Sequence, residues 1–253
     1  MSNPTTLPST KTSPWWVRLL FVAVGLGGWF WTQSIIGSRP PPVGAVIGDR
    51  ILDVLAAPNE YLRDHPAAAD ALLICSSAVI DALGLFLLFV SIFGKTVRPF
   101  LGLLLLFGMR QICQLLCALP PPEGIIWRSP GVPALLVTYD VATDFFFSGH
   151  TGLAVLGAVE LGRLGGRRCM WLGVAIILFE ATTVLVLRAH YTMDVITGII
   201  AARYATILAQ RWSPSCDRFL ASLDSRRPER ESARAASATH PPAALSDFDE
   251  HRG

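Results

Sequence analysis

Residues 71–93 read ALLICSSAVIDALGLFLLFVSIF, an apolar run that carries one charged side chain, Asp81. A helix needs about 20 predominantly apolar residues to cross the roughly 30 Å hydrocarbon core of a bilayer, and this run is long enough. Five further runs qualify, with approximate limits of 16–36, 100–119, 145–161, 170–187 and 191–209. The sequence therefore predicts an all-α, polytopic membrane protein with six transmembrane helices.

The composition of the 253 residues supports this fold class. Hydrophobic residues make up 52% of the chain and charged residues 16%, and the mean hydropathy is +0.47. An ordinary soluble domain carries about 25% charged residues. The formal net charge of +2 gives no basic footprint, which excludes a nucleic-acid partner. Tryptophan and tyrosine stand at many ends of the runs, as in an interfacial aromatic belt: Trp15, Trp16, Trp127, Trp171, Tyr191 and Trp212.

The chain divides into three parts by composition. We expect a cytoplasmic segment at 1–14, a membrane catalytic domain at 15–212 and a disordered cytoplasmic tail at 213–253, because the tail has few large apolar residues. A cleavable signal peptide is the alternative for the first run. That run is long, and bulky residues at 29–31 occupy the part where small residues should precede a cleavage site, so we expect it to be retained.

Basic residues predict the orientation of the six helices. On the side of the two termini lie Lys11, Arg18, Lys95, Arg98, Arg163, Arg167, Arg168, Arg211 and Arg218. The opposite side carries fewer basic residues over longer loops: Arg39, Arg50, Arg63, Arg128 and Arg188. The positive-inside rule then places both termini in the cytoplasm and the loops near 120–144 and 188–190 on the exoplasmic or luminal side, without indicating an organelle.

Two histidines stand at predicted helix starts on that exoplasmic side. His150 follows Ser148-Gly149, and His190 precedes Asp194 by four positions. Residues i and i+4 share a helix face, so the Asp194 carboxylate can reach the His190 ring. A carboxylate on one ring nitrogen fixes the tautomer and leaves the other nitrogen nucleophilic. Because both histidines lie at one depth of the bilayer, they can meet across the bundle.

The two histidines allow three interpretations. They could be satisfied structural groups, or His190 and Asp194 could be metal ligands. A catalytic metal usually has three protein ligands, and neither a second His/Asp pair nor a C-x-x-C is present, so we expect no metal. The third is phosphoryl transfer through a phosphohistidine, in which one imidazole attacks phosphorus and the other acts as acid and then base. Charge on the phosphate would be stabilised by Arg110, Arg188 and the amides near Ser148-Gly149.

At these positions the sequence resembles the type-2 phosphatidic acid phosphatase superfamily. More closely, it is similar to the branch of sphingomyelin synthases and phosphatidylcholine:diacylglycerol cholinephosphotransferases. The motifs that carry the resemblance, within about 110–209, are Ser148-Gly149-His150-Thr151, His190-Tyr191-Thr192-x-Asp194, Asp144 six residues before His150, Arg110 with Leu119-Pro120-x-Pro122, and Arg188.

The resemblance implies a six-helix lipid phosphatase/phosphotransferase-type bundle and a triad of His150, His190 and Asp194, with His190 as nucleophile. It implies transfer of a phosphocholine-type headgroup from phosphatidylcholine to diacylglycerol or ceramide, with no cofactor. The expected partners are thus membrane lipids, and a homo-oligomer is left open. The residues expected to bind the substrate phosphate are Arg110, Arg188, Ser148, Gly149, Asp144 and Tyr191.

The chain also departs from the phosphatases of that superfamily, which carry Lys-x6-Arg-Pro and a Ser-Arg pair. Lys95-Thr-Val-Arg98-Pro99 is too short, and no Ser-Arg pair precedes His190. Fewer cations favour a phosphodiester over a phosphomonoester, because the diester carries less negative charge. An exoplasmic lipid phosphatase and a phospholipase C-like hydrolase remain as alternatives at the same site, and a transporter or structural protein is the non-enzyme alternative. Candidates for contact with a choline cation are residues 145–147, Tyr139, Asp140 and Asp144.

Overall fold

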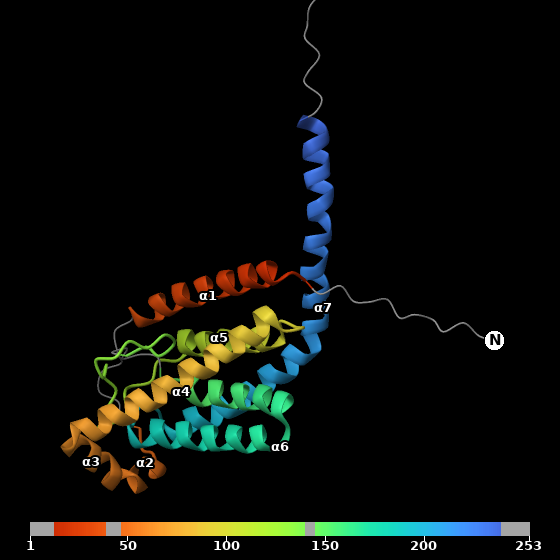
Figure 1. Ribbon diagram of the computed structural model, residues 1–253. Helices are drawn as coiled ribbons and strands as arrows, with labels where there is room; N and C mark the ends of the chain where they lie inside the picture. The colour runs from red at the N-terminus through yellow and green to blue at the C-terminus, as the bar shows by residue number, and fades with distance from the viewer. Residues whose placement is uncertain (1–12, 39–46, 140–144, 239–253) are drawn as a thin grey trace, which may run out of the picture.

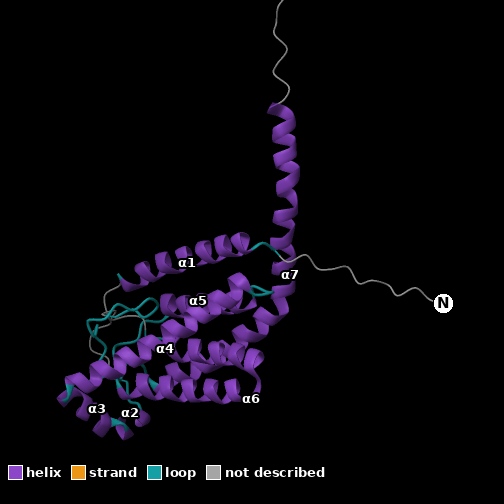
Figure 2. Ribbon diagram, viewed as in Figure 1, coloured by secondary structure: helices purple, strands orange, loops and turns teal. Residues whose placement is uncertain are grey.

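The computed structural model describes residues 13–38, 47–139 and 145–238, with side chains to residue 223. Within these ranges the chain forms seven helices and no strand (Figures 1 and 2). Five of them are long and apolar enough to cross a membrane: α1 (Trp15–Gly37), α4 (Pro66–Phe93), α5 (Arg98–Leu116), α6 (Gly149–Val186) and α7 (Thr192–Ala238). The prediction of an all-α, multi-pass integral membrane protein is confirmed.

Helix α6 contains two of the predicted spans. It bends at Gly166, whose φ of 64° and ψ of −150° are a conformation that glycine adopts at little cost. The second leg then runs back along the first (Figure 1), and a Cβ on Gly173 would lie 2.7 Å from the Cβ of Ala158. The five long helices therefore hold six apolar segments, in the order that the sequence predicts.

The start of α6 differs from the expected span at 145–161. The helix begins at Gly149 because the Ser148 hydroxyl caps it, accepting a hydrogen bond from the Thr151 amide at 3.3 Å. Phe145 and Phe147 are buried but precede the helix. Their apolar character reflects packing against the bundle and not membership of a transmembrane helix.

Two short helices, α2 (Arg50–Val54) and α3 (Ala56–Asp64), fill the loop between α1 and α4. The side-chain amide of Asn59 in α3 donates to the backbone oxygens of Gly124 at 3.2 Å and Val186 at 2.8 Å. These bonds join α3 to the loop that follows α5 and to the end of α6. The loop at 117–139 and both short helices thus cover the end of the bundle at which α6 begins.

The tail predicted to be disordered begins at residue 213, but α7 continues through this point and ends at Ala238. Asp217 accepts hydrogen bonds from Thr96 and Val97 in the turn between α4 and α5, and Leu220 is buried beside Val17 and Val97. Composition alone missed this order because the stabilising groups come from a distant turn. The C-terminal part of α7 projects from the bundle (Figure 1), and residues 1–12 and 239–253 lie outside the described ranges.

Charged side chains gather at the end of the bundle where α1 and α5 begin and α6 bends. Glu160 receives Arg98 at 2.8 Å and Arg163 at 2.6 Å, and Arg18 donates to the backbone oxygen of Gly94. His150 and His190 lie at the other end, where α6 starts and α7 starts. The segregation matches the sequence pattern, and the cytoplasmic orientation of the charged end stays a prediction.

Candidate active site

His150 and His190 line one small cavity of about 50 Å³, and Arg110 and Gly149 line it with them. His150 lies in the first turn of α6, His190 in the turn between α6 and α7, and Arg110 on α5. Both histidine rings are buried, with exposed fractions of 9% and 6%. The structure thus brings together residues from three helical segments that are far apart in the chain.

The tautomer of His190 follows from its hydrogen bond. Its Nδ1 lies 2.7 Å from the backbone oxygen of Phe145, which can only accept, so Nδ1 carries the proton. In the neutral ring, the other nitrogen, Nε2, then carries the lone pair, and its role as nucleophile stays a prediction. The nearest oxygen of Asp194 is Oδ2, at 3.7 Å from Nδ1. The carbonyl is therefore the direct partner of His190, and the carboxylate acts on the ring from a longer distance.

Asp194 also shapes the start of α7. Its Oδ2 accepts the amide of Tyr191 at 2.9 Å, while its Oδ1 is buried without a hydrogen-bond partner in the part of the chain that the structure describes. The backbone oxygen of Asp194 receives the amide of Ser148 at 3.1 Å. This contact requires close packing, and Gly198 allows it: a Cβ there would lie 2.7 Å from the Ser148 oxygen. The starts of α6 and α7 are thereby fixed against each other.

His150 has one ring nitrogen ready for a substrate. Its Nε2 is buried and has no hydrogen-bond partner among the described residues. The ring of Trp127 meets the imidazole nearly at right angles, at 85°, with centroids 5.2 Å apart. A buried polar atom without a partner is costly, so its retention in this cavity suits a group that bonds to a ligand.

Positive charge reaches the cavity from two sources. Arg110 is buried and donates from Nε to the Phe147 backbone oxygen at 2.8 Å, which holds its guanidinium beside the start of α6. The first amides of α6, at Gly149 and His150, have no acceptors within the helix and lie at the positive end of its dipole. Ser148 is fully buried and serves as the cap, so its hydroxyl supports this turn from outside the cavity.

Besides Ser148, three predicted phosphate ligands lie elsewhere or cannot be placed. Arg188 has a left-handed backbone with φ of 52°, and its guanidinium donates to the backbone oxygens of Glu123 at 2.6 Å and Leu52 at 3.1 Å. Tyr191 donates its hydroxyl to the Pro120 oxygen at 3.2 Å. Both line a separate cavity beside the loop between α1 and α4. Asp144 lies outside the described residues.

Two kinds of residue at the site are not predicted from the sequence. The aromatic side chains of the cavity come from four segments: Trp29, Phe107, Trp127 and Phe145. Of these, only Phe145 was named as a cation contact, since an aromatic residue in an apolar run is indistinguishable from one that faces lipid. Asp49 was also missed, although it binds the first residue of α7, accepting the Thr192 amide at 2.6 Å and its hydroxyl at 2.8 Å.

The hydrogen bonds of Asp49 perturb its acidity. Partial burial acts to raise the pKa of its carboxyl group, but the hydrogen bonds from Thr192, Leu52 and Ile51 outweigh burial and hold the pKa below its usual value. The last two are the capping bonds of α2, at 3.4 Å and 3.0 Å. One ionised carboxylate thus joins the starts of α2 and α7.

Within the described ranges, no group of three or more His, Cys, Asp or Glu side chains is placed to hold a metal ion. The site instead offers an imidazole with a free Nε2, a second imidazole, one guanidinium and helix amides. Nucleophile, proton donor and cations together suit transfer of an anionic group. Metal-free chemistry stays a prediction.

A comparison with known protein families gives a match over most of the membrane domain. The family model AtPDCT1/2, which describes phosphatidylcholine:diacylglycerol cholinephosphotransferases, matches residues 51–211. The matched range contains the two histidines, Asp194 and Arg110. A comparison with the curated proteins found no match. Because the family model spans more than half of the chain, the protein belongs to the AtPDCT1/2 family and is a membrane cholinephosphotransferase of phospholipids.

Proposed function

We propose that this enzyme moves phosphocholine from phosphatidylcholine to diacylglycerol through a covalent phosphohistidine at His190. One observation carries the proposal. In the neutral ring, the hydrogen bond from Nδ1 of His190 to the Phe145 oxygen puts the lone pair on Nε2, and the ring lines the same cavity as His150 and Arg110. A nucleophile, a proton-transfer group and a cation are then in one place.

In the first half-reaction, Nε2 of His190 attacks phosphorus and forms a P–N bond. The P–O bond to the diacylglycerol moiety breaks, and protonated His150 gives its proton to the departing oxygen. The negative charge of the incoming phosphodiester favours the protonated form of His150. Arg110 and the first amides of α6 stabilise the charge that gathers on the non-bridging oxygens.

The second half-reaction reverses these roles. The hydroxyl of an acceptor lipid loses its proton to His150 while its oxygen attacks phosphorus. The P–N bond to His190 breaks, which returns Nε2 to its unprotonated state and His150 to its protonated state. Atoms and protons therefore balance over one turnover, and no metal or external cofactor enters the scheme.

Choline recognition would fall to the aromatic wall formed by Trp29, Phe107, Trp127 and Phe145. Quaternary ammonium groups bind the faces of such rings, and tryptophan gives the strongest contact. Among the described residues that line the cavity there is no carboxylate. Aromatic faces would therefore take the place of an anionic partner for the choline cation.

Diacylglycerol is the acceptor that the family description favours, and ceramide is the second arm of the test. The purified full chain is supplied with phosphatidylcholine labelled in its phosphocholine group, together with unlabelled diacylglycerol or ceramide. We expect label in new phosphatidylcholine when diacylglycerol is present. Label in sphingomyelin would identify ceramide as the acceptor. Release of free phosphocholine at a rate independent of the acceptor would show that the enzyme is a hydrolase and not a transferase.

The covalent intermediate is tested separately by omitting the acceptor. Stoichiometric label should remain on the denatured protein, stable in base and lost in acid, and should be absent in His190→Ala. The control is His65→Ala, which should keep the label, because His65 is exposed and does not line the cavity. Transfer without any protein-bound label in wild type would overturn the phosphohistidine step.

A further inference from the structure

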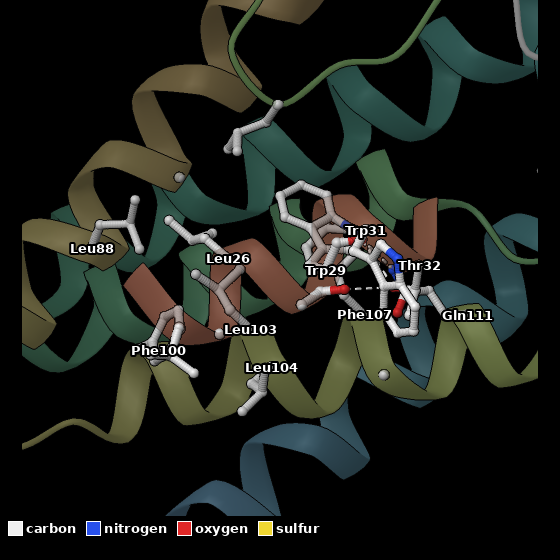
Figure 3. A pocket seen from close by; sticks show the side chains of 16 residues that line it. Leu26, Trp29, Trp31, Thr32, Leu88, Phe100, Leu103, Leu104, Phe107 and Gln111 are labelled. Atoms are coloured by element: carbon white, nitrogen blue, oxygen red, sulfur yellow. Dashed lines mark hydrogen bonds between the residues drawn. The ribbon is translucent and has the colours of Figure 1, made fainter. Parts of the chain in front are cut away.

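An apolar groove of about 370 Å³ lies between α1, α4 and α5 (Figure 3). Its lining is almost wholly hydrocarbon and includes Leu26, Leu88, Phe100, Leu103 and Leu104. No charged side chain of the described residues lines it. Two of its polar side chains are already bonded: Gln111 donates to the Trp29 backbone oxygen at 3.1 Å, and the Thr32 hydroxyl donates to carbonyls of its own helix. The indole Nε1 of Trp29 is buried and has no hydrogen-bond partner among the described residues.

The groove adjoins the histidine cavity. Trp29, Phe107 and Leu136 line both spaces. The rings of Trp29 and Phe107 are in contact, with centroids 4.8 Å apart, and together they form the wall between groove and cavity. A molecule in the groove would therefore have one end within reach of His150 and His190.

The dimensions of the groove match one leaflet of a bilayer. Along α5 it runs from Gln111, at the depth of the histidines, to Phe100 near the charged end. At 1.5 Å per residue this is roughly 16 Å, about half of the roughly 30 Å hydrocarbon core. Val24 and Trp31 of α1 stand at its rim and are each 68% exposed, so the groove opens where a bilayer would lie.

We propose that this groove binds an acyl chain of the glycerolipid substrate and delivers its headgroup past Trp29 and Phe107 to the histidines. The inference rests on the proposed function for the identity of the headgroup. Its own support is the apolar lining, the length of one leaflet and the shared wall. The histidine cavity of about 50 Å³ is small beside the 300–1,000 Å³ of ordinary ligand pockets, so a lipid must occupy adjoining space.

Three glycines allow a sharp test. A Cβ added at Gly27, Gly28 or Gly108 would meet nothing within 4 Å, so larger side chains fit without disturbing the packing. Gly28 and Gly108 line the groove, and Gly27 does not. Gly28→Leu and Gly108→Leu would fill the groove, and Gly27→Leu is the matched control. Leucine also favours a helix more than glycine does, so all three variants should fold.

The measurement uses phosphatidylcholine with a photoreactive diazirine on one acyl chain, incorporated in nanodiscs with the full-length protein. In wild type, we expect label on peptides from 24–32 and 100–111, and excess unlabelled lipid should suppress this labelling. Gly28→Leu and Gly108→Leu should lower this labelling and raise KM for long-chain phosphatidylcholine by at least about tenfold, since lost burial of two methylene groups corresponds to about that factor. The KM for short-chain dihexanoyl-phosphatidylcholine should stay the same in Gly28→Leu and Gly108→Leu as in wild type. The Gly27→Leu variant should match wild type in labelling and in KM.

Groove labelling is also measured in His190→Ala, which should lose transfer and keep the label, so that the acyl-chain site and the proposed reaction are tested separately. Label in the groove without transfer in wild type would leave the acyl-chain site standing while the proposed function fails. Label spread equally over all outward helix faces, or unchanged in Gly28→Leu, would mean annular lipid only and would overturn the inference. Direct mapping in wild type decides the case even where a variant does not fold.

Discussion

The two ends of the bundle handle buried charge in opposite ways. At the charged end, Glu160 is almost fully buried, and both of its oxygens accept from Arg98 and Arg163. At the histidine end, Nε2 of His150 and Oδ1 of Asp194 are equally buried, and neither has a partner within the described ranges. At the charged end, the buried carboxylate has all its hydrogen-bond partners, whereas the histidine end keeps buried atoms that can still bond to a ligand.

The difference separates structural from chemical use of polar groups in a membrane. Burying an ion is costly, and the cost is offset when every oxygen or nitrogen is bonded, as in the Glu160 cluster. Such a cluster fastens α5 to the bend of α6 and has little capacity left for a ligand. An unsatisfied imidazole such as that of His150 lowers stability, and a substrate can supply the missing bond. Mutations at the two ends should therefore affect different observables.

The largest effect should come from His190→Ala. Removing the nucleophile should lower kcat by at least roughly 10⁴-fold, by analogy with the losses seen when a covalent catalyst is deleted. Unfolding temperature should change little, because the ring contributes mainly one hydrogen bond. Transfer assays and thermal unfolding on the same detergent preparation give both numbers. Residual activity within tenfold of His65→Ala would remove His190 from the mechanism.

Asp194→Asn should have a smaller effect on kcat, of about 10²-fold. In a triad whose carboxylate alone fixes the histidine tautomer, the same change costs about 10⁴-fold. Here the Phe145 oxygen holds Nδ1 at 2.7 Å, and the carboxylate at 3.7 Å contributes mainly electrostatically. A loss as large as that of His190→Ala would show that Asp194 bonds His190 directly during turnover.

Much of this architecture was readable from the sequence because a membrane span is a one-dimensional signal. The apolar runs gave every long helix, and the motif spacing placed His150 and His190 at one end. The boundaries were less accurate. The run at 145–161 was read as starting at Phe145, since hydrophobicity cannot distinguish a buried loop from a helix, whereas the cap at Ser148 sets the true start.

The direction of side chains was not readable. Arg188 stands two residues before His190, yet its left-handed backbone directs its guanidinium to the backbone oxygens of Glu123 and Leu52. Trp127 reaches His150 from the long loop after α5, a contact that depends on tertiary packing. Similarly, the turn at 94–97 orders the chain beyond residue 213 through Asp217. Each failure involves a partner far away in sequence.

Glu160→Gln tests the saturated end. Removing the charge weakens the bonds to Arg98 and Arg163, and we expect a loss of about 2 kcal/mol in the free energy of unfolding, below the 3–5 kcal/mol of a fully buried pair. The discount reflects the partial exposure of the arginines, 26% and 29%. Denaturant titration measures the loss. At temperatures where the variant is folded, kcat should stay within about twofold of wild type, and a larger fall would link this end to catalysis.

The arginines of the histidine end offer a matched pair. Arg110→Lys should lower kcat by about tenfold, because a point charge cannot both bond the Phe147 oxygen and face a phosphate as a guanidinium does. Arg188→Lys should leave kcat within about threefold, since Arg188 bonds two loop carbonyls away from the cavity. Initial-rate assays at saturating lipid compare them. Equal losses of kcat in the two variants would indicate that Arg188 also contacts the substrate phosphate.

The smallest effect should be a pH dependence of stability from Asp49. Because the folded-state pKa of Asp49 lies below its unfolded value of about 3.8, its contribution is fully present above that value and is lost as pH falls through the folded-state pKa. Asp49→Asn removes this titration. Since Asp49 is only partly buried, the difference in free energy of unfolding should not exceed about 1 kcal/mol at pH 7, and it should shrink as the pH falls below the unfolded-state value of 3.8. Thermal unfolding of both proteins from neutral pH to below that value measures it. A difference that grows on acidification would mean that Thr192 is held by some other group, and that the start of α7 beside Asp194 does not depend on the Asp49 carboxylate.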